Sequence, residues 1–170
     1  MKIEYDGLAE SDLLVFARNI SEQYRSKIRK LTARSAGLLW RTYCYPGCFD
    51  FCAHCHDGNE AILISRTAFD ELDEEPAMKQ VAPWLCSIVD ALETESVWLL
   101  LSEWGLSGFE IPWEVFLATW YWLLTFPPEG HAVLPSKNVV VEFCAGECSA
   151  YRLSLSEAAG LLPDDLHEHT

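Results

Sequence analysis

The most apolar part of this chain is the segment 97–126, VWLLLSEWGLSGFEIPWEVFLATWYWLLTF. Three glutamates, two glycines and one proline interrupt it, so no apolar run within it reaches the ~18–20 residues of a membrane-spanning helix. Because so much apolar surface is unfavourable in water, this segment has to lie in the core of a folded domain. We expect a buried strand at Val97–Leu101, then a loop, then a tightly packed helix from Pro112 to about Leu124, since proline suits the first turn of a helix.

Other parts of the chain contain short runs that are typical of strands, separated by residues that favour turns. Pro46-Gly47 and Asp57-Gly58-Asn59 divide three such runs, which predicts an antiparallel meander. Two later runs flank the segment between Cys144 and Cys148, which predicts a hairpin. In chain order the runs are LLWRTYCY (38–45), CFDFCAHC (48–55), EAILIS (60–65), VVVEF (139–143) and SAYRL (149–153).

The spacing of apolar residues predicts helices elsewhere. Ser11 can cap an amphipathic first helix with a basic outer face, and Pro76 is expected to end a short acidic helix. Strands and helices in this arrangement predict one α+β domain over residues 1–170, an antiparallel sheet with helices packed on it. The expected helices are a basic N-terminal helix 11–34, an acidic helix 67–75, and two more at 83–92 and 156–162, followed by a frayed acidic tail 163–170.

The net charge of −14 narrows the range of partners. Residues 1–41 contain eight basic and five acidic side chains, whereas the remainder contains four basic and twenty-one acidic ones. Such an excess of acid argues against nucleic acid as a direct ligand and favours a positively charged partner. No apolar signal segment opens the chain and its seven cysteines are an odd number, so we expect reduced thiols and a cytoplasmic protein that does not enter a membrane.

Four cysteines and two histidines lie within CYPGCFDFCAHCH, residues 44–56. Both residue types bind zinc, but zinc folds usually place two short Cys/His pairs far apart, and ligands along one flat strand are too widely spaced to close a four-ligand shell. Core or half-buried thiols without metal or cofactor are therefore the favoured interpretation. The alternative is a zinc-stabilised domain that uses Cys44, Cys48, Cys52 and Cys55, with Cys144 or Cys148 as further ligands.

No catalytic signature is present: the chain lacks G-x-S-x-G, a phosphate-binding G-x-x-x-x-G-K, and H-E-x-x-H. We therefore expect a protein that is not an enzyme. A Cys–His nucleophile pair stays open as a lesser alternative, because such partners meet in space and not in sequence order.

Acidic and aromatic residues indicate a binding surface. Five carboxylates fall within residues 70–75, where they face either solvent at a helix start or a basic partner. Trp104 lies among carboxylates on a glycine-containing loop, which is typical of an interface anchor with an acidic rim, unless the indole folds inward to close the core. The candidate partner-binding residues are Asp70, Glu71, Asp73, Glu74, Glu75, Glu103, Trp104 and Glu110.

The tripeptide Glu103-Trp104-Gly105 follows a hydrophobic strand and precedes an aromatic segment and Gly130-His131. This pattern resembles one found in small bacterial immunity proteins, the inhibitors paired with antibacterial toxins. The resemblance covers the middle of the chain and implies no catalytic residues. With the acidic charge it implies a non-enzymatic inhibitor that binds and blocks a basic partner, such as a toxin or nuclease-like protein; a phage-type anti-defence inhibitor would carry the same acidic signature.

Overall fold

The computed structural model of this protein describes residues 2–8, 21–44, 60–69, 73–89, 95–101, 107–124, 129–144 and 146–154. The strands are β1 (Tyr5–Asp6), β2 (Arg29–Leu31), β3 (Glu60–Ala68), β4 (Ser96–Leu101), β5 (Ser107–Pro112), β6 (Glu129–Leu134), β7 (Val139–Cys144) and β8 (Glu147–Ser154). The helices are α2 (Glu22–Arg25), α3 (Ala33–Tyr43), α4 (Glu74–Ile88) and α5 (Trp113–Leu124), with a 3₁₀ turn η1 (Pro135–Lys137).

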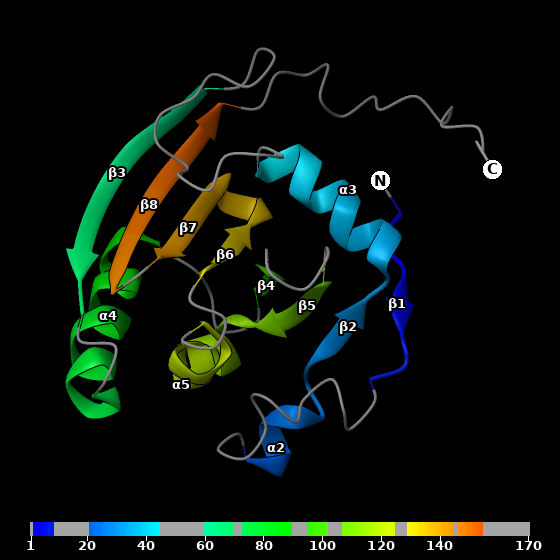
Figure 1. Ribbon diagram of the computed structural model, residues 1–170, viewed down its shortest axis with the longest axis horizontal. Coiled ribbons are helices and arrows are strands. Elements are labelled where there is room, and N and C mark those ends of the chain that lie inside the picture. The colour runs from blue at the N-terminus through cyan, green and yellow to red at the C-terminus, as the bar shows by residue number, and fades with distance from the viewer. Residues whose placement is uncertain are drawn as a thin grey trace.

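The eight described strands form one sheet in the order β1-β2-β5-β4-β6-β7-β8-β3, and every neighbouring pair is antiparallel (Figure 1). Helix α3 packs on one face of this sheet, while α4 and α5 pack on the other. The predicted α+β class, an antiparallel sheet with helices on it, is confirmed.

Two cores result from this arrangement, because successive side chains of a strand point to opposite faces. In β7, Val139, Val141 and Phe143 contribute to the core under α4 and α5. Val140 points the other way, into the core under α3. Both faces are covered, so the central strands are apolar on both sides and not alternately apolar and polar.

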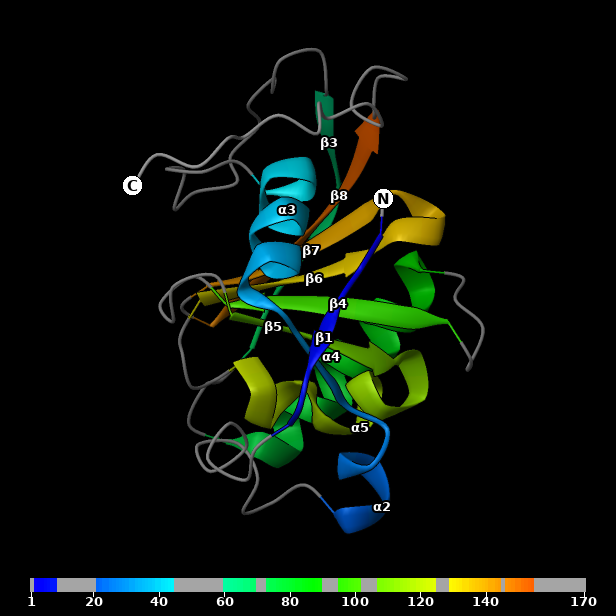
Figure 2. The same cartoon turned by 90° about the vertical axis from the view of Figure 1, so that its right-hand side faces the viewer.

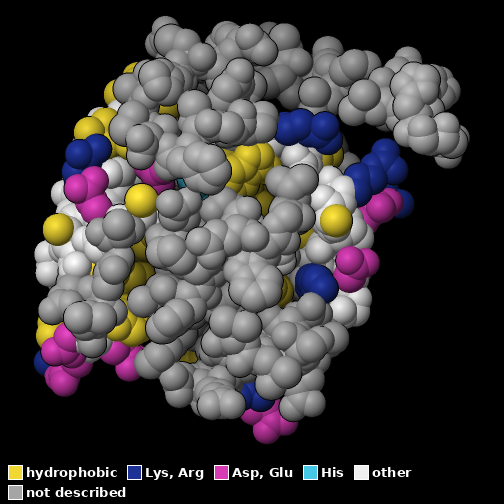
Figure 3. Space-filling view, viewed as in Figure 1, with side chains coloured by type: hydrophobic (Ala, Val, Ile, Leu, Met, Phe, Trp, Pro, Cys, Tyr) yellow, Lys and Arg dark blue, Asp and Glu magenta, His cyan; other side chains and the backbone are white. Residues whose placement is uncertain are grey.

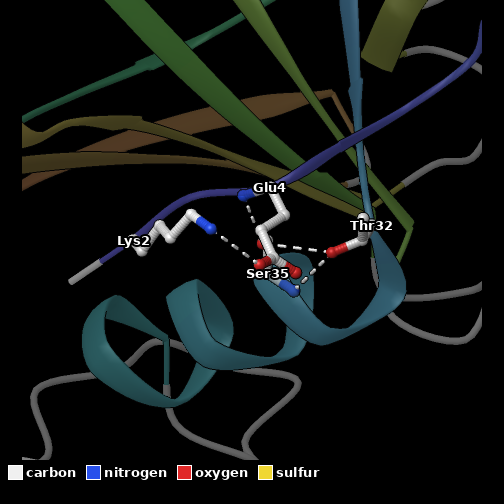
Figure 4. Close-up of polar contacts among 4 residues, drawn as sticks. All are labelled: Lys2, Glu4, Thr32 and Ser35. Atoms are coloured by element: carbon white, nitrogen blue, oxygen red, sulfur yellow. Dashed lines mark hydrogen bonds and ion pairs between the residues drawn. The ribbon is translucent and has the colours of Figure 1, made fainter.

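The start of α3 is tied to the N-terminal segment (Figure 4). Thr32 is the N-cap residue, and its hydroxyl oxygen accepts a hydrogen bond of 3.1 Å from the Ser35 backbone N–H. The Ser35 hydroxyl in turn accepts a hydrogen bond of 2.9 Å from the Glu4 backbone N–H, and Lys2 pairs with the Glu4 carboxylate. The Thr32 contact satisfies a backbone donor at the helix start, and the Ser35 contact ties the first turn of α3 to the N-terminal segment.

The predicted strand at 38–45 is wrong, because residues 33–43 form α3. By pattern alone, residues 38–45 fit either a strand or a helix. The Thr32 cap favours the helix, and so do Ala36 and Leu39, which lie three residues apart on the buried side of α3. The predicted meander is wrong as well, since its first run, 38–45, is helical as far as Tyr43. The other predicted strand of that meander, 48–55, lies outside the described residues.

The predicted single helix 11–34 is also wrong over its described part. Residues 22–25 form the short helix α2, and Arg29–Leu31 form β2, which pairs with β1 and β5. Ile28 and Leu31 would share one face of a helix, but in the fold they enter different cores, Ile28 on the α4–α5 side and Leu31 on the α3 side. Tertiary burial on both faces of the sheet therefore overrides the helical spacing.

The acidic helix predicted for 67–75 is wrong too. Strand β3 continues to Ala68 and α4 begins at Glu74, with Pro76 in its first turn, where a missing backbone N–H costs no helical hydrogen bond. The predictions at 60–65, 97–101, 112–124 and the hairpin 139–153 are confirmed by β3, β4, α5 and the β7–β8 pair. Strands β5 and β6 were not predicted, and residues 156–162 and 163–170 lie outside the described part.

Candidate functional site

Four polar side chains lie in register across four neighbouring strands on the α3 face of the sheet. His131 in β6 is aligned with Glu142 in β7, Glu142 with Ser149 in β8, and Ser149 with Arg66 in β3. We call these four residues the polar row. Such a row across an otherwise apolar sheet is a candidate for chemistry, because buried polar groups are costly unless they are paired or functional.

One end of the polar row is half-exposed. Arg66 Nε donates a hydrogen bond of 3.0 Å to Ser149 Oγ and lies 3.0 Å from Glu147 Oε1. The side chains of Arg66 and Glu147 are 49% and 46% exposed, so water screens this pair and its contribution to stability is small, about 0–1 kcal/mol. This end therefore holds β3 against β8 without forming a charged pocket.

The other end of the row is buried. His131 Nε2 lies 3.8 Å from Glu142 Oε1, and the edge of the Trp40 ring packs against the His131 ring at 5.0 Å between centroids. Burial lowers the pKa of His131 to about 4, so at neutral pH the imidazole is uncharged and its contact with Glu142 is not an ion pair. Cys44, at the end of α3, is buried on the same side.

The protonation states of this buried end do not match an activated cysteine. Burial, and then the charge of Glu142, raise the pKa of the Cys44 thiol well above its ordinary value. A nucleophilic cysteine requires the opposite, a lowered pKa beside a proton-accepting imidazole. The protonation states of Cys44 and His131 in this structure are not those of an activated nucleophile pair.

The cysteines that the structure describes do not assemble a metal site. Cys44 belongs to the core under α3, whereas Cys148 belongs to the core under α4 and α5, so the sheet separates them. In the described part of the chain, no group of three or more His, Cys, Asp or Glu side chains is placed to hold a metal ion. Cys48, Cys52 and Cys55 lie outside that part.

The acidic run is described only in part. Asp73 is the N-cap residue of α4, and Glu74 and Glu75 lie in its first turn; all three are exposed. Carboxylates at this position are favoured by the helix dipole, and Glu75 also pairs with Lys79 one turn later. Asp70 and Glu71 lie outside the described residues, as do Glu103 and Trp104.

Glu110, the remaining candidate, is inside the fold at 8% exposure. The Tyr5 hydroxyl donates a hydrogen bond to Glu110 Oε2, Arg29 Nη2 lies 2.6 Å from Glu110 Oε1, and the Arg29 guanidinium stacks over the Tyr5 ring. Burial would raise the pKa of Glu110, but hydrogen bonds from Tyr5, Ser96 and Arg29 outweigh it and hold the pKa below its ordinary value. This carboxylate links β1, β2 and β5, so we leave it out of the candidate binding surface.

A feature that the sequence did not reveal is the outer edge of β3. Ile62, Leu63 and Ile64 are 57%, 48% and 37% exposed, although all three are large and apolar. Strand β3 is the last strand of the sheet, and within the described residues it pairs with β8 alone. From the sequence, three consecutive apolar residues predict a strand that is buried on both faces. The exposure of Ile62–Ile64 becomes visible only when β3 is seen to lie at the edge of the described sheet.

Ile62–Ile64 lie in the first half of β3, whereas the acidic start of α4 lies beyond the last residue of that strand, Ala68. Gln80 of α4 donates hydrogen bonds to Thr67 Oγ1 and to the Ala68 carbonyl oxygen, and Trp84 Nε1 donates one of 3.0 Å to Ser65 Oγ. Helix α4 therefore runs back along β3, with its first turn beyond the end of the strand. Figure 3 shows hydrophobic side chains along this edge and carboxylates below them, over α4. We call Ile62–Ile64 together with Asp73–Glu75 the β3–α4 surface.

Comparison of the chain with protein-family models, with curated proteins and with solved structures found no match. Among the helices that the structure describes, none has the length and apolar character needed to cross a membrane.

Proposed function

We propose that this protein is a cytoplasmic, non-enzymatic inhibitor of the immunity type, which binds a basic partner protein and blocks the surface through which that partner acts. The observation that carries the proposal is the β3–α4 surface, which combines exposed apolar side chains in the first half of β3 with a group of carboxylates beyond its C-terminal end. Apolar contact area next to a charged rim is the composition of a protein-binding surface. The partner is a protein with a cationic face, such as a toxin or nuclease-like protein.

The two parts of this surface have different physical roles. Carboxylates on a molecule of net charge −14 attract a cationic protein over a distance and raise the association rate. Burial of the half-exposed side chains of Ile62, Leu63 and Ile64 then slows dissociation, at about 1 kcal/mol for each side chain. The protonated Cys44 thiol and the buried, neutral His131 support a binding protein over a Cys–His enzyme, because neither group has the protonation state of an activated pair.

The experiment uses the protein encoded by the neighbouring reading frame. That protein is expressed with and without this chain, growth is followed, and binding of the two purified proteins is measured at low and high salt. We expect relief of growth arrest, and binding that weakens with salt as the screening length falls from about 10 Å at 0.1 M to about 3 Å at 1 M. No binding and no relief, or binding that salt does not change, contradicts the proposal.

A matched pair of variants tests the acidic part. Glu74→Gln/Glu75→Gln removes two charges from the β3–α4 surface, whereas Asp6→Asn/Glu22→Gln removes two exposed charges from β1 and α2. We expect the first variant to associate about threefold to tenfold more slowly than the second at low salt, because charges beside a binding surface act on the association rate. Equal rates would place the contact elsewhere.

A further inference from the structure

The outer edge of β3 has the features of a strand that accepts another strand. It is nine residues long, contains no proline, and pairs on one side only within the described residues. Natural sheets protect such edges with lysines, prolines or short strands. Strand β3 contains no lysine or proline and is not short; it does carry Arg66 and a bulge-type register irregularity between Leu63 and Ser65, which are also protective devices, so its edge is partly and not fully protected.

The side chains near this irregularity are apolar on both faces of the strand. Leu63 is aligned with Tyr151, on the α3 side, while Ile62 is aligned with Arg152, on the α4–α5 side. Neither helix covers them, since both remain about half exposed. An added strand would therefore gain backbone hydrogen bonds along the edge and apolar contacts on both faces.

Charge decides what kind of strand fits this edge. Asp73 and the first turn of α4 place exposed carboxylates beyond the C-terminal end of β3. A second copy of this chain would bring another body of net charge −14 against the first, which is unfavourable. A segment rich in lysine or arginine would instead be attracted.

We propose that β3 is a strand-addition site, at which an extended basic segment of the partner protein pairs with residues 60–68. This inference rests on the proposed inhibitor function and assigns its contact. Main-chain hydrogen bonds provide the pairing, Ile62–Ile64 provide the apolar contacts, and the carboxylates of α4 select a cationic segment.

The probe is a nine-residue peptide of alternating lysine and valine, matched in length to β3. Its control has the same sequence with alternate backbone nitrogens methylated, which keeps the charge but removes the hydrogen bonds of one edge. Hydrogen exchange of the full chain, read by mass spectrometry, reports which amides become protected. We expect the unmethylated peptide to protect residues 60–68 and the methylated peptide to give no protection there.

Two charge-matched variants locate the contact. Ile62→Lys/Ile64→Lys adds two charges to the β3 edge, whereas Gln23→Lys/Ser26→Lys adds two charges to exposed positions in and beside α2. Helix α2 and strand β3 lie at opposite ends of the molecule in both views (Figure 2). We expect the β3 variant to bind the peptide at least about tenfold more weakly than the α2 variant.

Several outcomes overturn the proposal. Equal binding of the methylated peptide would indicate charge attraction alone, and protection confined to residues outside 60–68 would indicate another surface. Protection of 60–68 in the free protein that grows with its concentration, with a doubled mass, would assign the edge to a second copy. If the β3 variant relieves the growth arrest as well as the wild type, this inference fails while the inhibitor function stands; if the wild type gives no relief, the function itself fails.

Discussion

His131 is a residue whose ionisation the fold controls. In the unfolded chain a histidine has an ordinary pKa of 6.5, but burial beside Trp40 lowers the pKa of His131 to about 4. The unfolded state therefore binds more protons between these two values, so the folded state has its full stability above pH 6.5 and loses it as the pH falls toward 4. Glu142 and Cys44 face the same space, but neither removes this effect of burial.

Between pH 7 and pH 4, the free energy of unfolding is expected to fall by about 3 kcal/mol more in the wild type than in His131→Gln. The reason is the difference between the ordinary pKa of 6.5 and the folded-state pKa of about 4, since each pKa unit corresponds to about 1.4 kcal/mol. Urea unfolding followed by tryptophan fluorescence at several pH values measures the free energy of unfolding of both proteins. Identical pH profiles would show that His131 is not kept neutral.

Cysteine reactivity separates buried from exposed thiols. Burial raises the pKa of Cys44 well above its ordinary value and that of Cys148 in the same direction, whereas Cys86 lies exposed on α4. We expect iodoacetamide to label Cys86 in the native protein, and Cys44 and Cys148 only after unfolding, because the thiolate is the reacting form. Mass spectrometry of the digested protein identifies the labelled sites. Labelling of Cys44 at the same rate as Cys86 would contradict the raised pKa.

At the scale of an element, β5 depends on close approach between strands. A Cβ at Gly108 would lie 2.9 Å from Leu31 Cδ1 and 2.9 Å from the Leu99 backbone oxygen. Leu99 and Phe109 are aligned in the β4–β5 ladder, so that oxygen cannot move without disturbing the sheet. Gly7, by contrast, has no atom within 4 Å of such a Cβ.

Gly108→Ala is therefore expected to lower the free energy of unfolding by about 1–3 kcal/mol, the usual cost of overpacking. Gly7→Ala is the matched control and should be neutral or stabilising by about 0.4–1 kcal/mol, since it restricts the unfolded chain. Urea midpoints of the two variants and the wild type test this. A Gly108→Ala variant as stable as Gly7→Ala would mean that β5 shifts freely.

Strand β3 differs from the central strands in the exposure of its apolar side chains. Strands β4, β6 and β7 each have neighbours on both sides, and their apolar residues are buried by α3 on one face and by α4 or α5 on the other. Strand β3 has a comparable apolar run but one described neighbour, so Ile62, Leu63 and Ile64 remain accessible. Position in the sheet, and not composition, makes this strand a candidate for binding.

At the scale of the whole molecule, charge is distributed unevenly. The basic N-terminal part packs against the acidic remainder through Lys27 with Glu114 and Arg29 with Glu110. These contacts offset only a small part of the acid excess, since residues 42–170 carry four basic and twenty-one acidic side chains. The folded body therefore holds uncompensated negative charge, which opposes compaction and attracts cations.

The negatively charged side chains of the folded protein repel one another, and salt screens this repulsion. We expect the urea midpoint to rise when sodium chloride is increased from low concentration to about 1 M, because the screening length falls to about 3 Å. A neutral solute such as glycerol at matched viscosity controls for non-ionic effects. A midpoint that falls or stays constant with salt would indicate that the carboxylates are already neutralised by neighbours.

Part of the fold could be predicted because local pattern and tertiary burial agree there. The run Val97–Leu101 is apolar throughout and lies between covered faces, and Pro112 stands just before the helix that begins at Trp113. Residues 28–31 could not be predicted, because Ile28 and Leu31 have helical spacing yet enter opposite cores. Of the candidate site, the carboxylates Glu74 and Glu75 followed from composition, whereas the exposure of Leu63 did not.

The amino-acid sequence by itself determined the acid excess, the apolar segments that must be buried and the α+β class, since these follow from composition and local spacing. Only the tertiary structure decided that residues 33–43 are helical, that His131 and Glu142 meet, and that β3 is the last of the described strands in the sheet. The physical reason is that exposure, ionisation and strand pairing depend on neighbours distant in sequence, and local spacing contains no information about which neighbours a strand will have.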